Sequence, residues 1–284
     1  MKYGVSMFPT EYSIAPGALA RALEERGFES FWVPEHSHFP VSDMTPGRDS
    51  GGLPNMYYDV VDPFVALSMA AEATERIRLG TSICLVVQRD PIQTAKQVAS
   101  LDVLSGGRVD FGVGGGWNPF EIGQHGTDFT TRLALMKERI GAMKQLWTQE
   151  QAEFQGEFVN LAPSFAWPKP QQKPHPPIHV AANAPKGLGR VVAYGDGWFP
   201  MPGEDPEGTI FSQIPELHRR LEAAGRDPES VEISIYWAPA DEAFVARCQE
   251  TGVHRVIFMV DPVAEGEALA QADALATLAQ ACGR

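Results

Sequence analysis

The stretch RIRLGTSICLVVQRDPIQTAKQVASLDVLSGGRVDFGVGGGWN, residues 76–118, contains a complete strand–helix–strand unit. The apolar runs at 77–87 and 108–117 indicate two buried strands. Pro91 opens a helix between them, where its missing N–H is not needed, and the helix stops at Ser105–Gly106–Gly107. Continuous apolar strands joined by a helix are typical of a parallel sheet that helices cover on both sides.

The same alternation of strand-like and helix-like segments continues along the whole chain. Eight apolar runs each precede a helix-like segment, and they lie at residues 3–8, 30–36, 77–87, 108–117, 178–183, 197–201, 231–239 and 254–260. Eight such units in 284 residues predict a closed (β/α)8 barrel, with residues 1–284 forming a single domain. An open doubly wound sheet is the alternative, disfavoured because no glycine fingerprint follows the first strand.

Two segments interrupt this alternation of strands and helices. Residues 37–62 are polar and rich in Gly and Pro, which predicts a binding loop or lid. Residues 149–177, between the fourth helix and the fifth strand, are predicted to be an insertion on the barrel. They include FQGEFVNL (154–161), which indicates a hairpin, and a Pro-rich stretch.

Composition narrows the function. The chain has 23 Lys and Arg against 36 Asp and Glu, a net charge of −13, which argues against a nucleic-acid or anionic-membrane partner. No apolar run is long enough to span a membrane. The three cysteines, Cys84, Cys248 and Cys282, show no paired spacing, and no signal peptide is evident, so we expect a reducing cytoplasm.

In a barrel of this kind the active site lies at the C-terminal ends of the strands. Those ends are mostly apolar, aromatic or small here, and charge gathers at Glu35, His36, His38 and Asp261, which suits a flat apolar ring system. His36 and His38 have a spacing that can chelate a metal, as in a metal-dependent hydrolase. Too few further ligands stand at the other strand ends, so we expect no metal site.

Two small-residue stretches also follow strands. GVGGGWN (112–118) allows a ligand to approach the backbone closely, or forms only a tight turn. AANAPKGLGR (181–190) precedes a helix expected to begin near Pro185. Its free N–H groups and Lys186 suit an anion, or it is an ordinary packed joint. The residues leave both alternatives open.

Taken together, these motifs resemble the luciferase-like monooxygenase superfamily, and within it the branch of deazaflavin (coenzyme F-420)-dependent oxidoreductases. The resemblance rests on ALEERGFESFWVPEH (22–36), on residues 76–118 and on PPIHVAANAPKGLGRVVAYGDGWFP (176–200). It implies a cofactor ring at the barrel mouth that faces Glu35 and His36. A non-prolyl cis bond at Ser82–Ile83 would lie behind the ring, and Gly114 and Gly115 beside it.

The resemblance also assigns the phosphate arm and limits the substrate. The phosphate loop falls on Ala181, Ala182, Asn183 and Ala184, with Lys186 beside it. In the sugar-phosphate branch a glutamate acid matches Trp117, so a sugar-phosphate substrate is not carried over, and Trp117 makes the pocket wall more apolar.

The expected reaction is hydride transfer between F-420 and a small organic substrate. His36 would act as the acid or base, and Glu35 would orient or replace it. One alternative is an FMN-dependent monooxygenase that uses dioxygen and a partner reductase, and another is a non-catalytic flavin- or deazaflavin-binding protein. Similar proteins are often dimers, so we expect a homodimer.

Overall fold

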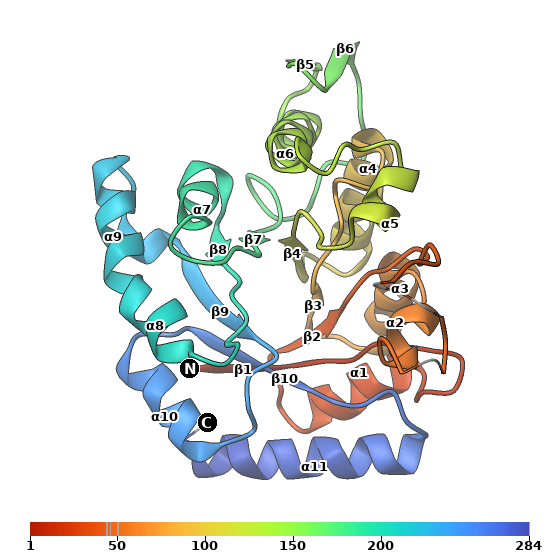
Figure 1. The fold of residues 1–284 in the computed structure, drawn as a ribbon, viewed down its shortest axis with the longest axis vertical. Coiled ribbons are helices and arrows are strands. Elements are labelled where there is room, and N and C mark those ends of the chain that lie inside the picture. The colour runs from red at the N-terminus through yellow and green to blue at the C-terminus, as the bar shows by residue number, and fades with distance from the viewer. Residues whose placement is uncertain (44, 46, 50, 284) are drawn as a thin grey trace.

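Eight parallel strands close into a barrel in the computed structural model, which describes residues 1–43, 45, 47–49 and 51–283 (Figure 1). The order around the barrel is β1-β10-β9-β8-β7-β4-β3-β2, which confirms the predicted (β/α)8 architecture. The strands are β1 (Lys2–Ser6), β2 (Ser30–Val33), β3 (Arg78–Thr81), β4 (Val109–Val113), β7 (Ile178–Val180), β8 (Gly197–Trp198), β9 (Glu232–Tyr236) and β10 (Arg255–Met259).

Closure depends on the first strand, which pairs with both the second and the last. Ser6 of β1 lies opposite Trp32 of β2 on one side and opposite Met259 of β10 on the other. Most strand residues are buried because the barrel interior and the surrounding helices cover the two faces of the sheet. This burial explains why the strands are continuous apolar runs rather than alternating ones.

Helices surround the strands (Figure 1). They are α1 (Pro16–Glu25), α2 (Asn55–Asp59), α3 (Pro63–Ala73), α4 (Pro91–Leu104), α5 (Pro119–Gln124), α6 (Arg132–Thr148), α7 (Leu188–Tyr194), α8 (Pro206–Thr209), α9 (Ile214–Ala223), α10 (Glu242–Glu250) and α11 (Glu265–Ala281), with short 3-10 turns η1 (Phe211–Gln213) and η2 (Pro228–Ser230). Proline and an acidic cap start several of them: the Asp62 carboxylate accepts hydrogen bonds from the backbone N–H groups of Phe64 and Val65 at the start of α3.

Several expected strand runs extend past the strands that they supply, and one helix at the barrel mouth starts later than expected. The apolar run at 77–87 supplies only the four residues of β3, because after Thr81 the chain leaves the ladder; it returns as an isolated bridge between Cys84 and Val113. The helix expected near Pro185 starts at Leu188 instead, since residues 184–187 form a turn in which Gly187 N–H donates to the Asn183 carbonyl at 2.7 Å.

The segment before β7 contains the expected hairpin. β5 (Ala152–Gln155) and β6 (Asn160–Ser164) pair in antiparallel fashion, and they project beyond α6 away from the barrel (Figure 1). The Glu138 carboxylate on α6 accepts hydrogen bonds from the backbone N–H groups of residues 157–159, which ties the hairpin turn to the helix.

The predicted loop at 37–62 is described only in part, because residues 44, 46 and 50 lie outside the described residues. Its described part includes α2, and Val61 N–H donates to the carbonyl of Pro9, in the segment that follows β1. In the part of the chain that the structure describes, no helix is long and apolar enough to cross a membrane.

Candidate functional site

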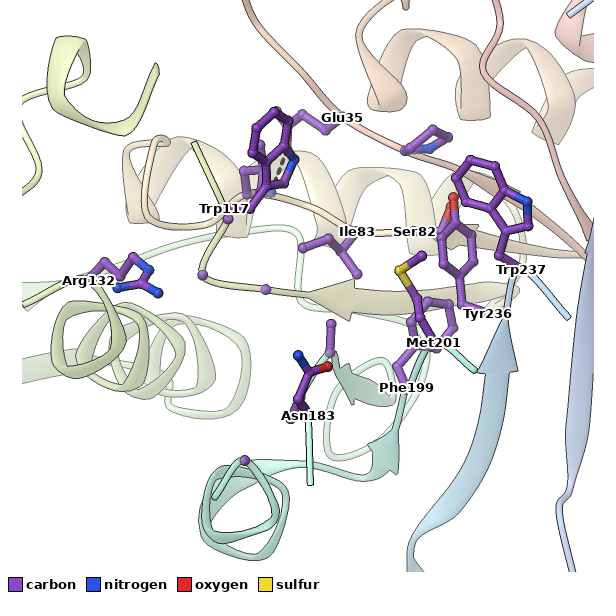
Figure 2. A pocket seen from close by; sticks show the side chains of 18 of the residues that line it. Glu35, Ser82, Ile83, Trp117, Arg132, Asn183, Phe199, Met201, Tyr236 and Trp237 are labelled. Atoms are coloured by element: carbon purple, nitrogen blue, oxygen red, sulfur yellow. Dashed lines mark hydrogen bonds between the residues drawn. The ribbon is translucent and has the colours of Figure 1, made fainter. Parts of the chain in front are cut away.

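A cavity of about 570 Å³ opens at the C-terminal ends of the strands (Figure 2). The structure brings together eleven of the twelve predicted site residues in its lining: Glu35, His36, Ser82, Ile83, Gly114, Gly115, Trp117, Ala181, Ala182, Asn183 and Lys186. Ala184 was expected with them, but it packs against the hydrophobic core instead. Ala184 lies in the turn at 184–187, and it faces the core while Lys186 and Gly187 of the same turn line the cavity.

His36 is held by a carboxylate that the sequence did not single out. Its Nδ1 lies 3.0 Å from Oε2 of Glu121 on α5, and the other carboxylate oxygen of Glu121 accepts from Ser37 N–H at 3.2 Å. An ionised carboxylate can only accept, so this bond places the ring hydrogen on Nδ1 and leaves Nε2 as the free ring nitrogen. Glu121 is fully buried, which makes it a fixed support for the imidazole.

Glu35 does not orient His36, contrary to the sequence expectation. Its carboxylate accepts from the guanidinium of Arg89 at 2.5 Å and from Leu85 N–H at 2.7 Å, and Arg89 continues to Asp62 at 2.6 Å. Burial raises the pKa of Glu35, while the Arg89 charge opposes that rise. Both carboxylate oxygens are occupied, so Glu35 anchors the loop after β3 rather than supporting the imidazole.

His38 does not line the cavity and instead belongs to a cluster of polar side chains with Ser37, Gln124 and His125. Its Nδ1 lies 2.9 Å from Ser37 Oγ, and its Nε2 lies 2.8 Å from the Gln124 side-chain oxygen. His125 also reaches Ser37 Oγ at 2.7 Å. Among the described residues, no group of three or more His, Cys, Asp or Glu side chains is placed to hold a metal ion.

The floor of the cavity comes from the segment after β3. The Ser82–Ile83 bond is cis, at the position where the resemblance suggested such a bond. Ser82 Oγ lies 3.1 Å from Ser6 Oγ. Ile83 occupies the space in which a Cβ at Gly114 would stand, so Gly114 is required for the Ile83 side chain rather than for a ligand approaching the backbone. Burial raises the pKa of the neighbouring Cys84 well above its usual value, which keeps that thiol protonated.

Cationic side chains line one end of the cavity: Lys186, Arg132 at the start of α6, and Arg190 on α7. The Arg132 guanidinium stacks 3.6 Å from the Phe129 ring and donates to the Phe129 carbonyl. Burial and the charge of Arg190 lower the pKa of Arg132. No carboxylate among the described residues pairs with any of the three, and Nε of both arginines is buried without a partner. We call this the cationic end.

Sequence reasoning missed both arginines for different reasons. Arg190 belongs to the stretch AANAPKGLGR, which the sequence already indicated as a candidate anion site, so its charge was an available signal. Arg132 comes from a different unit of the barrel, and nothing in its local sequence indicates where it points.

Aromatic side chains line the opposite end of the cavity. In the view of Figure 2, Tyr236, Trp237 and Met201 lie on one side of Ile83 and Arg132 lies on the other. The Phe8 ring centroid is 4.9 Å from that of Tyr57 and 6.2 Å from that of Trp237. Burial raises the pKa of Tyr236 to about 12, while hydrogen bonding with Ser6 and Ser82 opposes the rise, so its phenol stays neutral. We call Phe8, Tyr57, Met201, Tyr236 and Trp237 the aromatic end.

A family model described as luciferase-like monooxygenase matches residues 15–277. The chain belongs to this family. The match begins after β1 and includes the other seven strands of the barrel, and luciferase-like relatives include both dehydrogenases and monooxygenases. The protein is therefore an oxidoreductase of the luciferase-like kind.

Two curated relatives match most of this chain. An uncharacterised protein of Mycobacterium tuberculosis is 40% identical over 288 residues, covering 99% of this chain and 100% of the relative. An F420-dependent glucose-6-phosphate dehydrogenase of Kineococcus radiotolerans is 30% identical over 269 residues, 86% of this chain and 74% of the relative.

Two solved structures show the same fold at low sequence identity. Monooxygenase RslO1 from Streptomyces bottropensis has a TM-score of 0.78 at 22% identity and covers 99% of both chains. An F420-dependent secondary alcohol dehydrogenase with an F420–acetone adduct has a TM-score of 0.77 at 18% identity and covers 100% of both chains.

Proposed function

We propose that this oxidoreductase binds coenzyme F-420 at the barrel mouth and transfers hydride between it and a small organic substrate. The observation that carries the proposal is the cationic end, where Arg132, Lys186 and Arg190 have no carboxylate partner among the described residues. Arg132 and Arg190 are half-buried, whereas Lys186 is exposed. A half-buried cation without a counter-ion is stabilised when an anion binds beside it. The phosphate arm of a deazaflavin or flavin supplies such an anion.

The residues of the cavity fit the rest of the cofactor. Ser82 and Ile83 offer a floor for a flat ring, with Gly115 and Trp117 as the wall beside it. Ala181 and Ala182 are small, but the Ala181 N–H donates to the Val113 carbonyl at 2.9 Å and the Ala182 carbonyl accepts from Trp198 Nε1 at 2.8 Å. The phosphate arm would therefore meet the cations and the side-chain amide of Asn183. When bound, the deazaflavin supplies the hydride chemistry, and the protein supplies position and a proton.

His36 is the residue that holds this proton. Its free Nε2 can accept the hydroxyl proton of an alcohol, or return it to a carbonyl oxygen in the reverse direction. The buried carboxylate of Glu121 then faces a cationic imidazolium, which stabilises the charge that develops. His36→Ala is therefore expected to lower turnover by about 10²- to 10⁴-fold and to leave cofactor affinity nearly unchanged.

The deciding experiment is a titration of the purified protein with F-420 and with FMN at matched concentrations, followed by absorbance. We expect tighter binding of F-420. Preference for FMN supports the monooxygenase alternative, in which a partner reductase provides the reduced flavin, and RslO1 shows that the fold is compatible with a monooxygenase. Binding of F-420 without hydride exchange for any substrate supports the non-catalytic alternative.

A further inference from the structure

The aromatic end lies in the same cavity as His36 and contains no charged side chain of its own. Its members are neutral, and the charged residues that line the cavity are the cationic end, His36 and Glu35. The Glu35 carboxylate is paired with Arg89, so it does not offer its charge to a ligand. A substrate next to His36 on this side therefore meets apolar surface and aromatic ring faces.

Two polar groups are placed to bond the reacting oxygen of a ligand. One is Nε2 of His36, because Nδ1 is engaged by Glu121. The other is the hydroxyl of Tyr57, to which no described residue is hydrogen-bonded, and the Tyr57 ring centroid lies 5.6 Å from that of His36. Burial raises the pKa of Tyr57, so this hydroxyl stays a neutral donor. The pair suits a single uncharged oxygen.

We propose that the substrate is a neutral, predominantly apolar alcohol or ketone whose only polar atom is the reacting oxygen. This inference rests on the proposed function, because the cofactor must occupy the cationic end. In the oxidising direction the carbinol C–H bond breaks, and its hydride, carrying two electrons, bonds to the oxidised deazaflavin. The hydroxyl proton moves to Nε2 of His36, and the alcohol becomes a ketone.

The same geometry excludes a phosphorylated substrate from the loaded protein. The cationic end is the part of the cavity lining that suits a phosphate, and the cofactor arm takes it. Trp117 stands where the sugar-phosphate branch has a glutamate, and its side chain is 41% exposed at the cavity. A sugar phosphate would then place its charge against Trp117, Met201 and Trp237, where no counter-charge balances the loss of hydration.

The test is calorimetric titration of butan-2-one, hexan-2-one, octan-2-one and glucose 6-phosphate into the F-420-loaded protein and into the unloaded protein. Each added methylene is expected to tighten ketone binding by about fourfold until the aromatic end is filled. Glucose 6-phosphate is expected to bind only the unloaded protein, at the cationic end. Ketone affinity that is independent of chain length, or tighter binding of glucose 6-phosphate than of octan-2-one by the loaded protein, overturns the inference.

Two variants test whether the dependence of ketone affinity on chain length arises at the aromatic end. Trp237→Ala is expected to flatten the chain-length dependence and to leave the dissociation constant of F-420 unchanged. Met201→Gln tests the same wall without a risk to folding, because Met201 is 52% exposed, and it should weaken octan-2-one more than butan-2-one. Phe165→Ala, on the insertion and 71% exposed, is the matched control and should change neither ligand.

The same experiment separates the two proposals. A protein that binds neither F-420 nor FMN contradicts the proposed function, while the ketone series on the unloaded protein still measures the aromatic end. A protein that binds F-420 but shows no chain-length dependence for ketones contradicts only the substrate inference.

Discussion

Oε2 of Glu121 lies 3.0 Å from Nδ1 of His36, although the two residues are 85 positions apart in the sequence. The contact joins the loop after β2 to helix α5, which follows β4. It gives the imidazole a fixed tautomer, and the carboxylate is placed to stabilise a positive charge on the ring.

Glu121→Gln is expected to lower turnover by about 10²-fold or more, because the amide neither fixes the tautomer nor stabilises an imidazolium. Cofactor affinity should not change. Steady-state kinetics beside an absorbance titration of F-420 measure both quantities. Glu150→Gln, at an exposed carboxylate, is the control. If Glu121 acts through His36, Glu121→Gln should lower turnover little further when His36 is already alanine. Losses of turnover that add up in the double variant would contradict that role.

Arg132→Gln and Arg190→Gln should each weaken F-420 binding by about 10- to 100-fold, since each removes a charged donor to the anionic arm. The salt dependence of binding should also fall, because fewer charges are neutralised. Titrations at low and high salt measure both effects. Arg219→Gln removes a paired and 66% exposed arginine and should leave binding unchanged. Unaltered affinity in both cavity variants would place the anion elsewhere.

Gly114→Ala should destabilise the protein by about 1–3 kcal/mol and distort the cavity floor, because the new methyl group takes the space of Ile83 Cδ1. Thermal unfolding and F-420 titration measure the two effects. Ile83→Val in the same chain removes that Cδ1 and should restore part of both losses. Gly123→Ala meets nothing within 4 Å and lies in α5, so it is expected to be neutral or slightly stabilising.

The ion pairs of Asp110, at the opposite end of the barrel, lead us to predict that the protein loses stability in acid. It pairs with Arg78 at 2.6 Å and with the fully buried Arg255 at 3.5 Å. Burial alone raises the pKa of Asp110, but the hydrogen bonds from Arg78, the His179 ring nitrogen 3.6 Å away and the charge of Arg255 outweigh it and hold that pKa far below its usual value. A lowered folded-state pKa stabilises the fold above the unfolded value of about 3.9, and this contribution is lost as the pH falls below it.

Asp110→Asn should therefore lower the free energy of unfolding at pH 7 by about 3–5 kcal/mol, because two arginines lose their buried counter-charge. Denaturant titrations from pH 7 to pH 3 should also show a shallower acid loss in this variant than in the parent. Asp43→Asn, at an exposed carboxylate, serves as the reference. Equal acid slopes in all three proteins would remove Asp110 from the explanation.

Local patterns were sufficient for the barrel. Apolar runs, Pro at helix starts and glycines at turns act within a few residues of one another, so eight strand–helix units could be recognised from 284 residues alone. The rule that such strands expose their C-terminal ends at one mouth then placed His36 and Trp117 there, and the family resemblance added Ser82 and Ile83. The structure has all four in the lining of one cavity.

The partners of those residues are a property of the closed barrel. From segments after β4, Glu121 reaches His36 and Arg132 reaches the cavity, and Glu35 pairs with Arg89 instead of with its sequence neighbour. No pattern in a single segment records which side chain from another segment will face it, because that depends on the register and closure of the sheet. Sequence determined that a site exists and on which face, and tertiary packing decided which carboxylate supports the base and where unpaired positive charge gathers.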